Sequence, residues 1–341
     1  MTPPLRVLIV DDSAFARKVL REVMTQSAEL QVVGIARDGL EALEKFADLK
    51  PDVVTLDLVM PNLDGLGVLE AMSPADRARV VVVSTAQSES DLAIAALTLG
   101  AFDLVSKPTA LATARLYELG AELVLKVLAA GAARRVPTPV PQPERARAAP
   151  TQGQRKLLVI GTSTGGPQAL SRLLTALPGD FPLPIAVALH IPPGYTDALS
   201  RRINQAAALE VLEAENGIEL LPGRAVIARG GSHLRLSQVD QQLIGHLSSV
   251  PSDSAHFPSV DVLFLSAVGE CGSGVVGVVL TGMGDDGTRG AGAIHQAGGF
   301  VVTESESSCV VYGMPRAVVE AGFSDAQVPL SDLSHFLSHQ L

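Results

Sequence analysis

Short runs of apolar residues alternate with amphipathic stretches over the first 130 residues of the chain. The apolar runs lie at residues 5–10, 32–36, 53–56, 80–83 and 104–105, and helical spacing follows the first two, after Ser13 to about Gln26 and at 40–49. Runs that are apolar throughout, separated by amphipathic helices, are typical of a parallel sheet covered on both faces. We therefore predict an α/β domain over residues 1–130.

A second alternation of the same kind begins at Lys156, with apolar runs at 157–160, 185–189 and 277–280. It predicts a second domain over residues 155–341, built on a doubly wound, mostly parallel sheet. Residues 131–154, between the two domains, are rich in Pro, Ala, Arg and Gln and have no apolar period. This composition predicts a semi-extended linker.

In the first domain, polar residues stand where the predicted strands end. Asp11 and Asp12 follow the first strand, Asp57 follows the third, Thr85 the fourth and Lys107 the fifth. Because the carboxyl ends of parallel strands meet at one edge of a sheet, we expect these side chains in one crevice. Three carboxylates together favour a hard divalent cation such as Mg²⁺, and Lys107 could then hold an oxygen of a transferred phosphoryl group. The alternative is that each Asp caps the helix that follows it.

The second domain opens with a strand that runs into Gly161-x-Ser163-x-Gly165. This spacing is that of a nucleophile elbow, a sharp turn that exposes a serine hydroxyl and aims backbone N–H groups at an oxyanion. Two phosphate-binding alternatives fit less well, because the Walker pattern needs Gly-Lys-Ser/Thr and the dinucleotide fingerprint needs glycine where Ser163 stands. Ser163 is therefore a candidate nucleophile, provided that the chain supplies a base and an orienting acid.

His190 and Asp286 are the candidates for these two roles. Each comes just after an apolar run, so both are expected on the same rim of the sheet as the serine. Imidazole can take the serine proton near neutral pH, and a carboxylate fixes the tautomer and stabilises the imidazolium ion. His256 is a second histidine beside turn residues, and the pattern does not choose between Asp285 and Asp286, either of which could be a turn former. The order Ser…His…Asp differs from the Ser…Asp…His of α/β-hydrolases.

Composition narrows the classes of function. The net charge of −10 disfavours binding to nucleic acid or to an anionic membrane, and a chain without Trp is not expected to stack on nucleic-acid bases. No apolar run is long enough to cross a membrane and no signal segment is evident, so we expect a cytoplasmic protein without membrane insertion. Cys271 and Cys309 are too few for a disulfide framework and are expected to be buried thiols.

The motifs of the first domain are Val10-Asp11-Asp12-Ser13, Leu56-Asp57-Leu58-Val59-Met60-Pro61-Asn62-Leu63-Asp64-Gly65, Thr85 and Lys107-Pro108. Together they resemble the receiver domain of two-component response regulators. The resemblance implies a flavodoxin-like sheet, Asp57 as the phosphate acceptor, a histidine kinase as phosphodonor, and Mg²⁺ held mainly by Asp12 and Asp57. It also implies that Thr85 and Lys107 sense the phosphoryl group and that the Lys107–Pro108 bond is cis.

The motifs of the second domain are Gly161-Thr162-Ser163-Thr164-Gly165-Gly166, His190, His256-x-Pro258-Ser259-Val260-Asp261, Leu280-Thr281-Gly282-Met283-Gly284-Asp285-Asp286-Gly287 and Ser308-Cys309-Val310-Val311-Tyr312-Gly313-Met314-Pro315. They resemble the catalytic domain of the CheB family of chemotaxis protein-glutamate methylesterases. The resemblance implies Ser163 as nucleophile, His190 as base, Asp286 as orienting acid, and no cofactor in this domain.

The two resemblances together imply a phosphorylation-activated serine esterase. Its substrates would be glutamyl methyl esters, and receptor glutamines for deamidation, on methyl-accepting chemoreceptors. The unphosphorylated receiver is expected to block the rim that carries Ser163. Two alternatives stay open: the same chemistry in a signalling system other than chemotaxis, and a receiver fused to a non-catalytic binding module.

Overall fold

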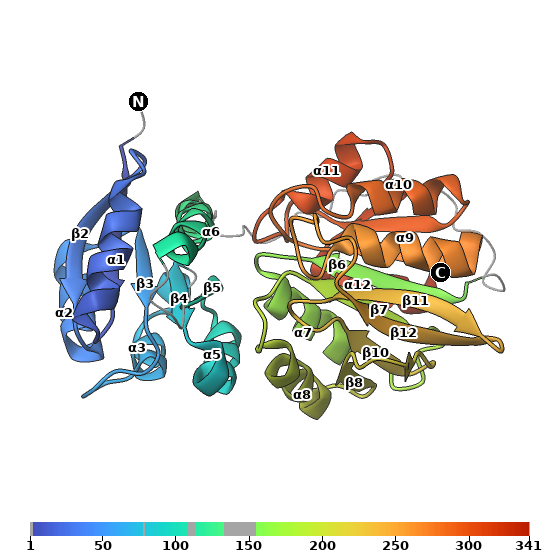
Figure 1. Cartoon of the computed structure of the whole chain (residues 1–341), viewed down its shortest axis with the longest axis horizontal. Coiled ribbons are helices and arrows are strands. Elements are labelled where there is room, and N and C mark those ends of the chain that lie inside the picture. Colours follow the sequence, from blue (N-terminus) through green and yellow to red (C-terminus); the bar gives the residue numbers. More distant parts are fainter. Residues whose placement is uncertain (1–2, 78, 108–112, 133–154, 341) are drawn as a thin grey trace. The chain divides into compact units, whose positions relative to one another are not determined.

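The computed structural model describes residues 3–77, 79–107, 113–132 and 155–340. The chain divides into two compact units, Met1–Arg135 and Val136–Leu341, and each is described by itself (Figure 1). Residues 133–154 of the predicted linker and the Lys107–Pro108 peptide bond lie outside the described residues.

The described part of the first unit contains a parallel sheet of five strands in the order β2-β1-β3-β4-β5. The strands are β1 (Leu5–Val10), β2 (Leu30–Ala36), β3 (Val53–Leu56), β4 (Val80–Ser84) and β5 (Asp103–Ser106). This order is that of flavodoxin-like folds, so the predicted fold class of the first domain is confirmed. The four residues of β3 and the five of β4 are all buried, as both-faced coverage requires.

Helices cover the two faces of this sheet. They are α1 (Ala14–Thr25), α2 (Gly39–Leu49), α3 (Gly65–Ala71), α4 (Pro74–Arg77), α5 (Ala86–Leu99) and α6 (Thr113–Ala132). α1 packs against α6, whereas α2 contacts α3 and α3 contacts α5, which gives one helical layer on each face. Ser13 caps α1 by accepting a hydrogen bond from the N–H of Ala16, as the sequence predicted.

The second unit is built on a parallel sheet of seven strands among the described residues, in the order β15-β14-β13-β6-β7-β10-β8. The strands are β6 (Leu157–Thr162), β7 (Ile185–Leu189), β8 (Glu210–Glu213), β10 (Arg224–Ile227), β13 (Val275–Val279), β14 (Phe300–Glu304) and β15 (Ala326–Val328). The chain starts in the middle at β6, builds outward through β7, and returns to build the other half from β13. The doubly wound prediction is therefore confirmed.

The strand order of the sheet reverses between β6 and β13, and this position determines where a functional crevice is expected. In such sheets the crevice forms outside the carboxyl ends of the strands at the point where the order reverses. Gly161 is in register with Val279 on one side and with Ala188 on the other. Ser163, the loop after Val279 and His190 thus emerge side by side at one edge.

Two layers of helices enclose the seven-stranded sheet (Figure 1). They are α7 (Gly166–Ala176), α8 (Thr196–Ala206), α9 (Val260–Cys271), α10 (Thr288–Gln296), α11 (Met314–Glu320) and α12 (Leu330–His339), with a 3₁₀ turn η2 at Gly272–Gly274. α9, α10 and α11 lie on one side, and α7 packs against α8 and α12 on the other. None of the described helices is long and apolar enough to cross a membrane.

The sequence missed part of this unit. A three-stranded antiparallel sheet, in the order β11-β12-β9, consists of β9 (Ile218–Glu219), β11 (His233–Val239) and β12 (Gln242–Ser248). Its strands are only partly buried, so they lack the continuous apolar runs by which β6, β7 and β13 were found. The sequence analysis also named no strand at β8, β10, β14 or β15. The strand predicted at 277–280 is β13 at Val275–Val279, and Leu280 already belongs to the loop.

Candidate functional site

The predicted acidic cluster forms at the carboxyl edge of the first sheet. Asp11, Asp12 and Asp57 each offer a carboxylate oxygen, and these oxygens lie within 4.8 Å of one another. Lys107 reaches in from the end of β5, with Nζ 2.8 Å from Asp11 Oδ2 and 2.7 Å from Asp57 Oδ2. Asp11 and Asp57 are buried whereas Asp12 is exposed. Three hard oxygen donors of this kind fit a divalent cation such as Mg²⁺.

Burial raises the pKa of Asp57 to about 6, although the hydrogen bond and charge of Lys107 act in the opposite direction. The charges of Asp11 and Glu89 add to the rise. A single lysine therefore does not offset the cost of gathering these carboxylates. A bound cation would favour the ionised form of Asp57, which is the form that can attack phosphorus.

Thr85, the predicted switch residue, is hydrogen-bonded to Glu89 of α5, a residue that the sequence analysis did not single out. Thr85 Oγ1 donates to Glu89 Oε1 at 2.6 Å, and the Thr85 N–H and Ser84 Oγ donate to Oε2 at 2.9 and 2.8 Å. Burial opposes ionisation of Glu89, but these hydrogen bonds lower its pKa. Thr85 is thus hydrogen-bonded to a carboxylate whose charge also interacts with Lys107.

Ser163 stands at the turn between β6 and α7. Its N–H donates to the carbonyl of Thr281 at 3.1 Å, and its own carbonyl accepts from Gly166 N at 2.7 Å. The left-handed residue of the turn is Gly165, at φ +76°, where an added Cβ would lie 2.7 Å from Val310 Cβ. The glycine flanking Ser163 is therefore required by both conformation and space.

His190 and Asp286 are joined directly. His190 Nε2 lies 2.8 Å from Asp286 Oδ2, and each side chain is only 10% exposed. The backbone N–H of His190 donates to Thr162 O at 3.0 Å, which brings it beside Ser163. With Nε2–H given to the carboxylate, Nδ1 is the ring nitrogen able to accept a proton, and this buried atom has no hydrogen-bond partner among the described residues. Ser163 Oγ makes no hydrogen bond to His190 among those residues; such contacts often tighten only when substrate binds.

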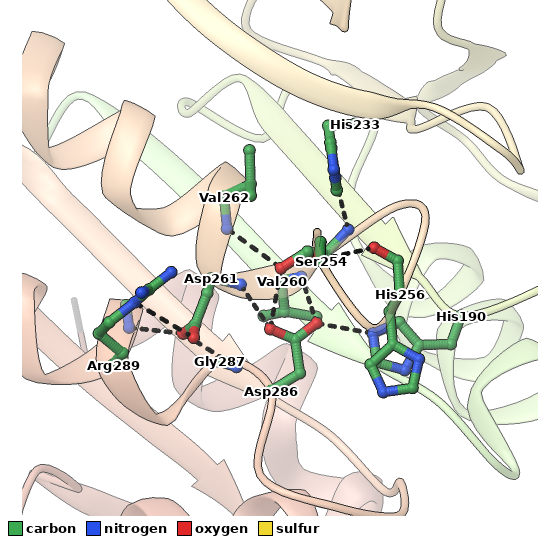
Figure 2. A network of polar contacts seen from close by, with 12 residues as sticks. His190, His233, Ser254, His256, Val260, Asp261, Val262, Asp286, Gly287 and Arg289 are labelled. Atoms are coloured by element: carbon green, nitrogen blue, oxygen red, sulfur yellow. Dashed lines mark hydrogen bonds and ion pairs between the residues drawn. The ribbon is translucent and has the colours of Figure 1, made fainter. Parts of the chain in front are cut away.

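Asp286 also sits on the N-terminus of α9 (Figure 2). Its Oδ2 accepts from Val260 N at 2.7 Å, while Oδ1 accepts from Asp261 N and Ser259 Oγ, both at 3.0 Å. Burial acts against ionisation, but the hydrogen bonds from His190 and from the helix N–H groups hold the pKa of Asp286 well below its usual range. The carboxylate is thus charged and fixed in direction.

This cradle assigns a structural role to the segment 256–261, which the sequence analysis noted only as a family motif. It also has a counterpart, because Asp261 Oδ1 accepts from Gly287 N and Gly290 N at 3.1 and 2.7 Å and so caps α10. Asp286, in the loop before α10, therefore accepts from the first N–H groups of α9, and Asp261, in the first turn of α9, accepts from those of α10. Asp285, the open alternative, is exposed, and of the two neighbouring carboxylates it is Asp286 that contacts His190.

His256 stacks on the ring of His190, with centroids 3.9 Å apart and planes at 18° (Figure 2). It lines a surface pocket of about 450 Å³ together with Asp285, Asp286 and Arg289. The two histidines that stood beside turn residues thus meet in one place. Neither Ser163 nor His190 lines this pocket, which adjoins His190 only through His256 and Asp286.

The loop after β13 packs directly against Ser163. Gly282 N donates to Val311 O at 3.0 Å, and Gly282 O accepts from Met314 N at 2.9 Å. A Cβ on Gly282 would lie 2.8 Å from Ser163 Cβ and 2.4 Å from Met314 Sδ. Backbone alone fits against the serine here, so the loop can present N–H groups close to it.

The predicted thiols take no part in these contacts. Cys309 is buried, Cys271 is partly buried, and both are free. Burial raises the pKa of each thiol, so neither is an activated nucleophile.

Two family models match the chain: response regulator receiver domain at residues 7–117 and CheB methylesterase at residues 158–337. The protein-glutamate methylesterase/protein-glutamine glutaminase 5 of Myxococcus xanthus is 63% identical over 97% of this chain and 96% of its own length. The protein-glutamate methylesterase/protein-glutamine glutaminase 2 of Koribacter versatilis is 40% identical over 99% of this chain and 97% of its own length. The crystal structure of the Thermotoga maritima CheB methylesterase catalytic domain is similar with a TM-score of 0.54 and 38% identity, over 55% of this chain and 99% of that one.

Proposed function

The chain belongs to the CheB family of protein-glutamate methylesterases, and from this premise we propose that it is a serine esterase that removes methyl groups from receptor glutamates and is activated by phosphorylation of its receiver domain. The observation that carries the proposal is the His190–Asp286 hydrogen bond on the rim that bears Ser163. Membership of an enzyme family disfavours the alternative of a non-catalytic binding module.

The geometry supports a definite division of roles. Ser163 Oγ attacks the ester carbonyl while His190 takes its proton on Nδ1, and the anionic Asp286 stabilises the resulting imidazolium ion through Nε2–H. Backbone N–H groups of Thr164 and Gly165, and of the loop at Met283, would hold the oxyanion, a contribution typically worth about 10²–10³ in kcat per donor. His190 then protonates the leaving methoxide, and methanol departs.

The acyl-enzyme is hydrolysed by the same residues in reverse. His190 takes a proton from water, the hydroxide attacks the acyl carbonyl, and Ser163 leaves with the proton returned by His190. A glutamine side chain can follow the same path with ammonia as the leaving group. We therefore include deamidation of receptor glutamines in the proposed activity.

The receiver supplies the control. Asp57 would accept the phosphoryl group from a histidine kinase, and Asp11, Asp12 and Asp57 would hold Mg²⁺, which neutralises charge on that group. Lys107 would pair with the phosphoryl oxygens, and Thr85 would exchange Glu89 for them. We propose that the unphosphorylated receiver blocks the rim that carries Ser163 and that this rearrangement removes the block. A tenfold change in the open population requires only about 1.4 kcal/mol.

The substrates would be methyl-accepting chemoreceptors and the location the cytoplasm, where their modified helices and the kinase would lie. The experiment is methanol release from methylated receptor membranes, with and without a small phosphodonor. We expect Ser163→Ala to be inactive and Asp57→Asn to keep basal activity without activation. Unchanged activity of Ser163→Ala would refute the esterase mechanism, and activation of Asp57→Asn would refute the assigned phosphate acceptor.

A further inference from the structure

Glu304, the last residue of β14, is a fully buried acid that the mechanism above does not use. Its side chain is 0% exposed. Its hydrogen-bond partners include the Thr281 N–H and Ser308 Oγ, both neutral, and it makes no ion pair among the described residues. A buried carboxylate without a paired cation is costly, so this position calls for an explanation.

The carboxyl group is connected to the nucleophile through one residue. Glu304 Oε2 accepts from Thr281 N at 2.8 Å. The carbonyl of the same Thr281 accepts from Ser163 N at 3.1 Å and from Thr162 Oγ1 at 2.8 Å. Thr281 Oγ1 donates to Thr164 O at 3.0 Å, so all three residues of the turn are tied to Thr281.

The second oxygen of Glu304 is hydrogen-bonded to Ser308. Ser308 Oγ lies 2.9 Å from Oε1 and 3.3 Å from Ser305 O, and it accepts from Leu330 N at 3.0 Å. If the carboxyl is neutral, its O–H donates to Ser308 Oγ, and the serine hydroxyl is free to donate to Ser305 O. If it is ionised, the hydroxyl donates to Glu304, and Ser305 O keeps two backbone donors, Ser308 N and Cys309 N. These hydrogen bonds are satisfied in both forms, and it is full burial without a paired cation that favours the neutral form.

The electrostatics of the position also favour the neutral acid. Burial raises the pKa of Glu304, against hydrogen bonds from Thr281, Ser308 and Cys309 and the charge of Arg172 on α7. Arg172 is exposed and makes no ion pair with Glu304 among the described residues, so its charge is screened by water.

We propose that Glu304 is a positioning residue for the esterase reaction, and that as a neutral carboxylic acid it fixes Thr281 and through it the Ser163 turn. The inference rests on the proposed function, since it concerns the same nucleophile. A shift of the turn by a fraction of an ångström would misdirect Ser163 Oγ and the oxyanion donors without changing the surface that binds the receptor. Loss of Glu304 should therefore lower kcat and leave KM in place.

The test measures kcat and KM for methanol release by the full chain, activated with a small phosphodonor. Glu304→Gln keeps an oxygen for Thr281 N–H and an N–H donor for Ser308 Oγ, so we expect kcat within about twofold of wild type. Glu304→Ala leaves the buried Thr281 N–H unsatisfied, and we expect kcat to fall about tenfold to a hundredfold with KM unchanged.

The matched control is Asp325→Ala, because Asp325 is also buried and accepts a backbone hydrogen bond from β14, at Val301 near the other end of the strand. It should lose stability but keep kcat. If Glu304→Ala does not fold, Ser308→Ala removes the second anchor of the carboxyl group and should lower kcat severalfold.

Three results would overturn the inference: an unchanged kcat in Glu304→Ala or its substitute Ser308→Ala, an equal loss of kcat in Asp325→Ala, or a Glu304→Gln variant as impaired as Glu304→Ala. Failure of the proposed function itself looks different. In that case wild type releases no methanol, or Ser163→Ala releases as much as wild type.

Discussion

Replacement of Asp286 by Asn tests the orienting acid with the smallest change in shape. The carboxylate accepts from His190 Nε2 and Val260 N on one oxygen, and from Asp261 N and Ser259 Oγ on the other. An Asn side chain offers one oxygen and one NH₂ group. In either orientation the NH₂ faces a backbone N–H of α9, so one buried donor always meets another donor.

The loss of rate follows from the two orientations. With NH₂ toward His190, the ring must accept at Nε2 and carry its proton on Nδ1, which disables the base. Such a tautomer change costs about 10⁴ in kcat in serine hydrolases. With the amide oxygen toward His190, the tautomer is kept, but the negative charge that stabilises the imidazolium ion is gone. We therefore expect kcat to fall between about 10² and 10⁴, with little change in KM.

The stability of the second unit should fall as well. An unsatisfied buried N–H and the loss of charge-assisted hydrogen bonds together cost about 2–4 kcal/mol. The pKa of Asp286 is lowered in the folded state, so the carboxylate stabilises the fold above its unfolded pKa of about 3.9, and this stabilisation is lost as the pH falls through the folded pKa. The difference between wild type and Asp286→Asn should be full near pH 7 and shrink below about pH 4.

The assays are methanol release, and urea unfolding followed by far-ultraviolet circular dichroism at a series of pH values. Asp261→Asn is the control, because Asp261 caps α10 but does not contact His190, and burial raises its pKa. Ionised Asp261 therefore destabilises the fold near neutral pH, and its Asn variant should lose little stability and keep most of kcat. A kcat of Asp286→Asn within threefold of wild type, or a stability difference that does not change with pH, would refute the assigned role.

Three further predictions concern the surroundings of the nucleophile and its control. Gly282→Ala should lower kcat at least about tenfold, because its Cβ would lie 2.8 Å from Ser163 Cβ; a fully active variant would contradict the close packing. His256→Ala should lower kcat about threefold to tenfold and His256→Phe should restore it, since ring stacking is worth about 1 kcal/mol; failure of Phe to rescue would show that stacking is not the contribution. Deletion of residues 1–150 should raise basal methanol release, and an isolated second unit no more active than the whole chain would rule out autoinhibition.

The sheet of the first unit and the central strands β13, β6 and β7 of the second could be predicted because these strands carry their own signal. Residues 5–10 and 53–56 are apolar except for Arg6 and Thr55, and they coincide with β1 and β3. The antiparallel sheet carries no such signal. In β11, Leu234 and Leu236 pack into the core while Arg235 between them is exposed, and the strand is held in place by contact with α9. Tertiary packing, which no local pattern reports, creates that element.

The residues with candidate chemistry could be found by their position after strands, but their supporting partners could not. Asp286 is held by the N-terminus of a helix 26 residues earlier, through Val260 N. Glu89 reaches back to Thr85 across the first turn of α5. Glu304 contacts Thr281, which is 23 residues away. These contacts are set by sheet order and helix placement, and the residue types alone do not distinguish them from ordinary surface acids.

Three carboxyl groups show how the surroundings shift the pKa values of chemically similar side chains in different directions. Asp286 receives N–H groups from a helix terminus and an imidazole, and its pKa is lowered, as suits a permanent anion beside a base. Burial, with smaller contributions from Asp11 and Glu89, raises the pKa of Asp57 to about 6 despite its lysine, so that a bound cation would favour the ionised, nucleophilic form. Glu304 has neither helix terminus nor paired cation, and its raised pKa suits a neutral donor and acceptor. If this assignment is correct, Asp286→Asn should lower kcat and Asp57→Asn should lose activation by the phosphodonor, whereas Glu304→Gln should preserve both.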